Sequence, residues 1–181
     1  MTNPAAADTT ATDQGRSTRR AVLGLGAFGA AMAVARTASA AAEEAPSIAE
    51  FAMTAELTAQ ELYLLADGEL WTLLASHHGA YAQRIAGLAG LSAQGRNDAI
   101  YDALSDAFSG SDPSAAAIEL ENTLAATHTE LLGLELDGPV VSAVASIAVT
   151  ESRHAATIAV ESGADLETQL VNSAAAIAPE A

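Results

Sequence analysis

Apolar residues recur along most of this chain at alternating spacings of three and four residues, which is the pattern of helices that bury one face. Two segments show the pattern most clearly. The stripe within residues 69–89 consists of Trp71, Leu74, His78, Tyr81, Ile85 and Leu88. The stripe within residues 139–162 consists of Val144, Ile147, Glu151, His154 and Ile158. No long segment alternates β-branched and polar residues, so the sequence predicts an all-α fold.

Turn and capping residues divide this pattern into four long helices and one short helix. Ser47 followed by Glu50 is typical of a helix N-terminus, while Asp67-Gly68 and Asp137-Gly138-Pro139 are typical of tight breaks. The predicted helices span about residues 47–66, 69–89, 97–108, 114–136 and 139–162. The expected order is a pair of helices joined by a short turn, a long crossover, and a second such pair. The tail, residues 163–181, is expected to be weakly helical at best and to fray.

The first 40 residues are predicted to be an export signal rather than part of the fold. Paired arginines at positions 19 and 20 precede a mildly apolar run of about 15 residues, which is short for a membrane-spanning helix. Ala38-Ser39-Ala40 then provides a cleavage pattern of small residues. Residues 1–40 resemble a twin-arginine signal, which implies the twin-arginine export machinery as a partner and a location in the periplasm, the cell envelope or the medium. Cleavage would leave residues 41–46 as a linker, and the alternative is an uncleaved N-terminal anchor.

Composition and charge narrow the range of partners. The formal net charge is −16, from 7 basic and 23 acidic residues, and 21 of the acidic residues follow position 40. Such a surface repels nucleic acid and anionic membranes, so neither is expected as a partner after processing. The absence of cysteine rules out disulfides, thiolate metal sites and cysteine nucleophiles. There is also no phosphate-binding glycine loop and no nucleophile elbow.

Polar residues interrupt the two clearest stripes at matching positions. Glu151 and His154 form a Glu-x-x-His pattern in the later stripe, and His78 and Tyr81 occupy the same two positions in the earlier stripe. Glu-x-x-His on a core-facing helix is how four-helix bundles supply a carboxylate and an imidazole to a buried metal. The earlier pair is therefore an altered copy of the later one.

The first and third long helices carry a looser match. Glu56 is followed seven residues later by Tyr63, and Glu121 is followed seven residues later by His128. Seven residues make almost two turns, so each pair shares one helix face. Counting from the two short turns at about 1.5 Å per residue places the polar positions of adjoining helices at similar depths. Each predicted hairpin therefore brings its candidate ligands to one height.

In the order of their predicted helices, the common depth of their polar positions and the Glu-x-x-His motif, residues 47–162 are similar to the ferritin-like superfamily. The chain looks most like bacterial ferritin-like domain proteins that carry an export signal. The resemblance implies a ferritin-like four-helix bundle with one long crossover between its second and third helices. In di-iron members, two helices each give one Glu and two give Glu-x-x-His. The resemblance therefore implies metal ligands at Glu56, His78, Glu121, Glu151 and His154. Many ferritin-like proteins dimerise, which makes a homo-oligomer an expectation as well.

The altered copy of the motif leaves the cofactor open. His78 in place of a bridging Glu removes a bridge and a negative charge, and Tyr81 in place of a His removes a good neutral ligand. The remaining donors could hold one Fe, Mn or Zn ion, a distorted pair of ions, or no metal. Without metal, the same side chains would form a buried hydrogen-bonded network, with Tyr63 and Tyr81 as further partners. With a metal, Tyr63, Tyr81 and His128 are the candidates for side chains that hydrogen-bond the ligands.

The sequence leaves the roles of several other histidines and glutamates to be decided. His128 is interpreted either as a ligand or as a donor that hydrogen-bonds a ligand. Glu61 competes with Glu56 as the carboxylate of the first helix. His77 lies off the apolar stripe and is expected to be exposed. The glutamates expected at the surface are Glu119, Glu130 and Glu135.

Two functions from different classes follow from the sequence. The first is an exported ferritin-like protein that binds a transition metal for metal handling or oxidant defence. The second is a non-enzymatic helical scaffold or interaction protein with a degenerate, metal-free site. Catalytic residues are not assigned by the sequence.

Overall fold

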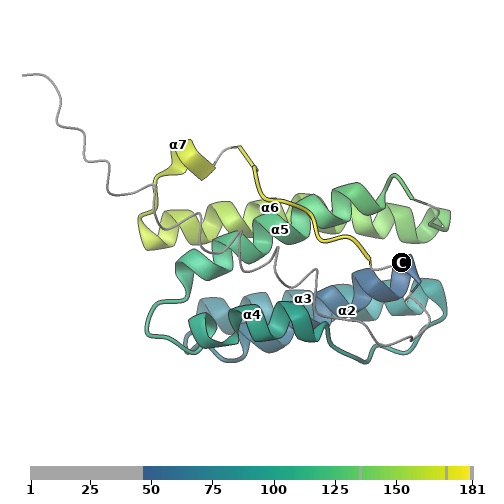
Figure 1. The fold of residues 1–181 in the computed structure, drawn as a ribbon, viewed down its shortest axis with the longest axis horizontal. Helices are drawn as coiled ribbons and strands as arrows, with labels where there is room; N and C mark the ends of the chain where they lie inside the picture. Colours follow the sequence, from purple (N-terminus) through teal and green to yellow (C-terminus); the bar gives the residue numbers. More distant parts are fainter. Residues whose placement is uncertain (1–46, 135, 170, 180–181) are drawn as a thin grey trace, which may run out of the picture.

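The computed structural model describes residues 47–134, 136–169 and 171–179, and the predicted signal (1–40) and linker (41–46) lie outside the described residues. The described residues form six helices and no strand, as the all-α prediction requires. The helices are α2 (Ile48–Tyr63), α3 (Glu69–Ala89), α4 (Asp98–Phe108), α5 (Ser114–Leu131), α6 (Gly138–Ser162) and α7 (Leu166–Gln169) (Figure 1). Within these ranges, no helix has the length and apolar character needed to span a membrane.

Most helix boundaries agree with the predicted caps and breaks. The Ser47 Oγ accepts a hydrogen bond of 3.2 Å from the Glu50 amide at the start of α2. The predicted ends near residues 66 and 136 are wrong, because α2 ends at Tyr63 and α5 ends at Leu131. Just past both ends, backbone amides bond to carbonyls three residues back, and this tighter turn ends the α-helical ladder.

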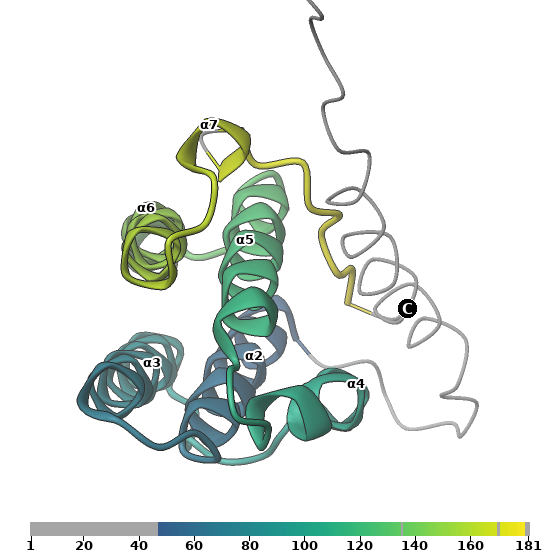
Figure 2. The ribbon, with the colours of Figure 1, turned by 90° about the vertical axis from the view of Figure 1, so that its left-hand side faces the viewer.

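The four long helices pack as two antiparallel hairpins. α2 packs along α3 and α5 packs along α6, and the two hairpins meet through α3 against α6 and α2 against α5. Seen along their axes, these four helices surround a common centre, and α4 lies outside them against α2 and α5 (Figure 2). α4 belongs to the long connection between the hairpins, so the predicted crossover is present.

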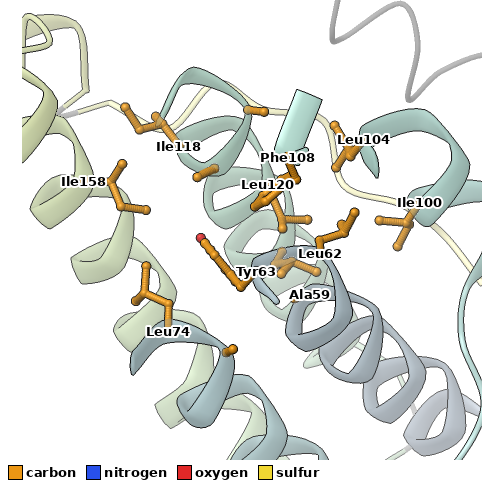
Figure 3. Packing of buried hydrophobic residues seen from close by; sticks show 14 of the residues in the cluster. Ala59, Leu62, Tyr63, Leu74, Ile100, Leu104, Phe108, Ile118, Leu120 and Ile158 are labelled. Carbon is orange, nitrogen blue, oxygen red and sulfur yellow. The ribbon is translucent and has the colours of Figure 1, made fainter. Parts of the chain in front are cut away.

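Two hydrophobic clusters fill the interior, one toward each end of the long helices. The first cluster surrounds Tyr63 and includes Phe108 from α4 and Ile158 from α6 (Figure 3). The second cluster lies toward the other end and includes Ile85 from α3 and Ile147 from α6. Since α2, α3, α5 and α6 all contribute to both clusters, each long helix is fixed near both of its ends.

A layer of buried polar side chains lies between the two hydrophobic clusters. On α3, His78 lies between Leu74 of the first cluster and Ile85 of the second. On α6, Glu151 lies in the same way between residues of the two clusters and is fully buried. This polar layer is the region in which the predicted ligands are found.

The expectation that the C-terminal tail frays is wrong for residues 171–179. After α7 the chain passes beside α5 (Figure 2). The Asn172 side chain donates a hydrogen bond of 2.7 Å to the Asn122 carbonyl, and the Ile177 amide donates one of 2.9 Å to the Thr127 Oγ1. The Ile177 side chain also packs against both hydrophobic clusters. Contacts with α5 thus replace the hydrogen bonds that a helix would have supplied.

Candidate metal centre

The five predicted ligands come together in the polar layer. They are Glu56 from α2, His78 from α3, Glu121 from α5, and Glu151 and His154 from α6. Four of them have no exposed surface, and His154 is 6% exposed. The equal heights expected within each hairpin are confirmed, because side chains from all four long helices contact one another at this level.

His78 lies between two carboxylates. Its Nδ1 is 2.7 Å from the Glu56 Oε2, and its Nε2 is 3.1 Å from the Glu121 Oε1. Burial lowers the pKa of His78, but the charges of Glu121 and Glu56 outweigh burial, so the pKa lies well above the ordinary value of 6.5. The protonated ring donates from both nitrogens and supplies positive charge inside an acidic cluster.

Glu121 is approached by donors from three sides. Its Oε1 accepts hydrogen bonds from the Tyr63 hydroxyl at 2.7 Å and from His78, and its Oε2 lies 3.3 Å from the His154 Nδ1. Burial raises the pKa of Glu121. The charge of His78 and the hydrogen bonds from His154 and His78 lower it by a larger amount, so the pKa is about 2. Burial, followed by the charge of Glu121, raises the pKa of Tyr63 well above 10.0. Tyr63 therefore remains a neutral donor to an ionised carboxylate.

Glu151 pairs with His128 of the neighbouring helix α5. The His128 Nδ1 lies 2.9 Å from both carboxylate oxygens of Glu151. Burial, followed by the charges of Glu56 and Glu121, raises the pKa of Glu151 well above 4.5. Burial also lowers the pKa of His128. This end of the cluster therefore favours a neutral imidazole.

Two buried atoms in the same region lack a hydrogen-bond partner. They are the Glu56 Oε1 and the His128 Nε2, which lie 3.5 Å apart. When the Nδ1 of His128 donates to Glu151, its Nε2 carries a lone pair and faces the Glu56 oxygen as a second acceptor. Buried polar atoms normally have partners, and a cation between two acceptors would satisfy both. In this tautomer of His128 the two atoms fit a site for a positive ion, whereas in the other tautomer the Nε2 would donate toward the Glu56 Oε1.

The donor atoms form two overlapping triads. His78, Glu121 and His154 make one triad, and Glu56, His78 and Glu151 make the other. Within each triad the ligand atoms all lie within 4.8 Å of one another. Carboxylate oxygens and imidazole nitrogens in this combination suit first-row transition metals such as Fe, Mn and Zn. The residues of the polar layer therefore fit such an ion.

His77 is the main departure from the sequence prediction. It is half-buried instead of exposed, and its Nδ1 lies 3.0 Å from the His154 Nε2. Tyr81, one turn further along α3, also lies beside His154, with its ring centroid 6.3 Å from that of His154 and the rings inclined by 18°. The stripe pattern could not identify His77, because its position falls one residue off the apolar spacing. Its place next to His78 is the signal in the sequence that points to it.

The structure also separates the competing glutamates. Glu61 is half-buried and lies 3.3 Å from a guanidinium in the connection between α3 and α4, so Glu56 is the carboxylate that α2 places in the polar layer. Of the glutamates expected at the surface, Glu130 is exposed and Glu119 is half-buried. Glu135 lies outside the described residues.

No protein-family model, curated protein or solved structure matches this chain. The packing of its helices and the chemistry of its polar layer are therefore the observations from which its function can be inferred.

Acid should remove the contribution of Glu121 to stability. The pKa of Glu121 is about 2 in the folded chain against an ordinary value of 4.5, so folding favours its ionised form. This contribution is fully present above pH 4.5 and is lost as the pH falls toward 2, a change of about 3 kcal/mol. We expect the difference in free energy of unfolding between wild type and Glu121→Gln, measured by urea denaturation, to shrink over this range. A difference that stays constant between about pH 5 and about pH 2 would contradict the depressed pKa.

Proposed function

We propose that this chain is an exported ferritin-like protein whose four-helix bundle holds a transition-metal ion at its centre. The observation that carries the proposal is that Glu56, His78, Glu121, Glu151 and His154, from all four long helices, meet in two overlapping triads of buried donor atoms. Two helical hairpins joined by a long crossover support the ferritin-like arrangement. Export rests on the resemblance of residues 1–40 to a twin-arginine signal.

The donor chemistry favours Fe, Mn or Zn. The polar layer offers three carboxylates and the imidazoles of His78, His128 and His154, and no cysteine occurs in the chain. A bound ion would supply Lewis acidity or, for Fe and Mn, redox chemistry, which suits metal handling or oxidant defence. The side chains themselves would hold the ion and exclude bulk water. His78 would release a proton on binding, because a ligating nitrogen must carry a lone pair.

A single ion fits the polar layer better than a carboxylate-bridged pair. Both triads contain His78, so one ion could occupy either triad, whereas two ions would require this one ring to bridge them. The ferritin-like resemblance places a bridging Glu at the position of His78, and an imidazole there removes a negative charge that would help to offset a second cation.

A scaffold with a metal-free core is the second candidate, and the hydrogen bonds of the polar layer favour it. Tyr63 and His78 both donate to Glu121, and His128 pairs with Glu151. A buried network in which most polar atoms have partners can stabilise one packing of the helices without an ion. In that case the protein would act through its surface, as a partner in the envelope or in self-association.

Metal content distinguishes the two candidates. The full chain, produced with its N-terminal segment in medium that contains Fe, Mn and Zn, should retain one of these metals at a fixed ratio to protein by elemental analysis. The double variant Glu56→Gln/Glu121→Gln should lose most of the metal, because it removes a charged donor from each triad. Its matched control is Glu61→Gln/Glu130→Gln, which changes a half-buried carboxylate on α2 and an exposed carboxylate on α5 and should keep the metal. Metal-free wild type that takes up none of the three ions in equilibrium dialysis would favour the scaffold.

A further inference from the structure

The two ring nitrogens of His154 face different partners. The Nδ1 faces inward and lies 3.3 Å from the Glu121 Oε2, and it belongs to one of the two triads. The Nε2 faces the Nδ1 of His77 at 3.0 Å. The rings of His77 and His154 are nearly parallel, with centroids 5.2 Å apart and an interplanar angle of 22°, and they meet through these two nitrogens. His154 is therefore held between the polar layer and a half-buried imidazole that belongs to neither triad.

An imidazole that ligates a metal through one nitrogen keeps its proton on the other, and a partner that accepts this proton fixes the tautomer and the orientation of the ring. We propose that His77 is the positioning residue of His154: when the Nδ1 of His154 ligates an ion, and so no longer donates to Glu121, His77 accepts a hydrogen bond from the Nε2 and holds the ring in that orientation. This inference rests on the proposed metal centre, in which His154 is a ligand. The adjacent residues His77 and His78 then have different roles: His78 ligates the ion, and His77 orients the ligand His154.

The location of His77 fits this task. It lies on α3, one turn before Tyr81, and both side chains lie beside the His154 ring. The Nδ1 of His77 is already directed at the Nε2 of His154, so it is not free to point toward the triads. Because His77 is half-buried, it can be substituted with little disturbance of the core.

A pair of substitutions at position 77 tests the hydrogen bond. His77→Leu removes the acceptor, and we expect the affinity for Zn²⁺, measured by calorimetry on the full chain, to fall by about 10- to 100-fold. His77→Asn places an amide oxygen near the position of the Nδ1, and should retain affinity within about threefold. Ser76→Ala, at the exposed neighbour on α3, is the control for changes in the helix itself and should leave the affinity unchanged.

The pattern of these affinities separates positioning from other roles. If His77 were itself a ligand, His77→Asn would lose as much affinity as His77→Leu. If His77 only assisted passage of the ion, His77→Leu would slow binding and release equally in stopped-flow measurements and leave the affinity unchanged. Either result would overturn the proposal. In a His154→Ala background, His77→Leu should cost no further affinity, because the ring that it positions is absent; a full additional loss there would also overturn it.

A measurement on the metal-free chain keeps this inference separate from the metal centre. The ¹⁵N resonance of the His154 Nε2 reports its hydrogen bond, and we expect it to shift in His77→Leu and to stay close to wild type in His77→Asn. If wild type binds no Zn²⁺ while this shift is present, the proposed metal centre fails and the contact between His77 and His154 stands. If the resonance is the same in wild type and both variants, His77 does not orient His154.

Discussion

Replacing Glu121 with leucine should cost the metal-free chain about 3–5 kcal/mol of unfolding free energy, the loss expected when one partner of a buried ion pair is removed. The substitution would leave the Tyr63 hydroxyl and the His78 Nε2 without their acceptor in a layer that has no exposed surface at these positions. His154 would lose its inner partner as well. Chemical denaturation of chelator-treated protein measures the effect.

Two further variants define what this loss means. Glu130→Leu, at an exposed position on the same helix, should change the stability by less than about 0.5 kcal/mol. The double variant Glu121→Leu/His78→Leu should recover part of the loss, because it removes the stranded imidazole together with the carboxylate. A loss of less than about 1 kcal/mol for Glu121→Leu alone would mean that these donors do not depend on Glu121.

Zn²⁺ should stabilise the wild-type chain by about 4 kcal/mol at a free concentration about 1,000 times its Kd. The folded chain brings donors from four helices to one place, whereas the unfolded chain keeps only local pairs such as Glu151 and His154 close together. An ion that binds the folded state much more tightly than the unfolded state shifts the equilibrium toward folding. Urea denaturation with and without Zn²⁺ measures this gain.

A matched pair of variants on α6 locates the bound ion. The double variant Glu151→Gln/His154→Gln should lose most of the stabilisation by Zn²⁺, because it removes a buried donor from each triad. Glu161→Gln changes an exposed carboxylate on the same helix and should keep it. Equal stabilisation of both variants would place the ion on the acidic surface, where cations gather without a specific site.

The helices and the height of the polar layer could be predicted from the sequence because both depend on local spacing. α3 begins and ends at the predicted residues, Glu69 and Ala89, because the glycines that break the helix, Gly68 and Gly90, directly flank it in the sequence. The depth of each candidate ligand is a count of residues from a turn, multiplied by the rise of a helix. The relative positions of residues in one helix or one hairpin can therefore be predicted from the sequence pattern.

Contacts between separate helices could not be predicted in the same way. His77 falls off the apolar stripe, and its contact with His154 depends on how α3 and α6 approach each other. The choice between Glu56 and Glu61 depends on the rotation of α2 against its neighbours, which periodicity alone does not fix. The docking of Ile177 against α5 depends on an acceptor, the Thr127 Oγ1, that lies 50 residues earlier in the chain.

The burial of the polar layer also limits the size of any reactant. Glu56, His78, Glu121 and Glu151 have no exposed surface, and His154, which lies beside His77 and Tyr81, is 6% exposed. An organic molecule of ordinary substrate size would need the hairpins to separate before it could touch these donor atoms. A bare ion, a water molecule, dioxygen or peroxide is small enough to need a much smaller opening. The polar layer therefore excludes large molecules by their size, independently of which ions its donor atoms prefer.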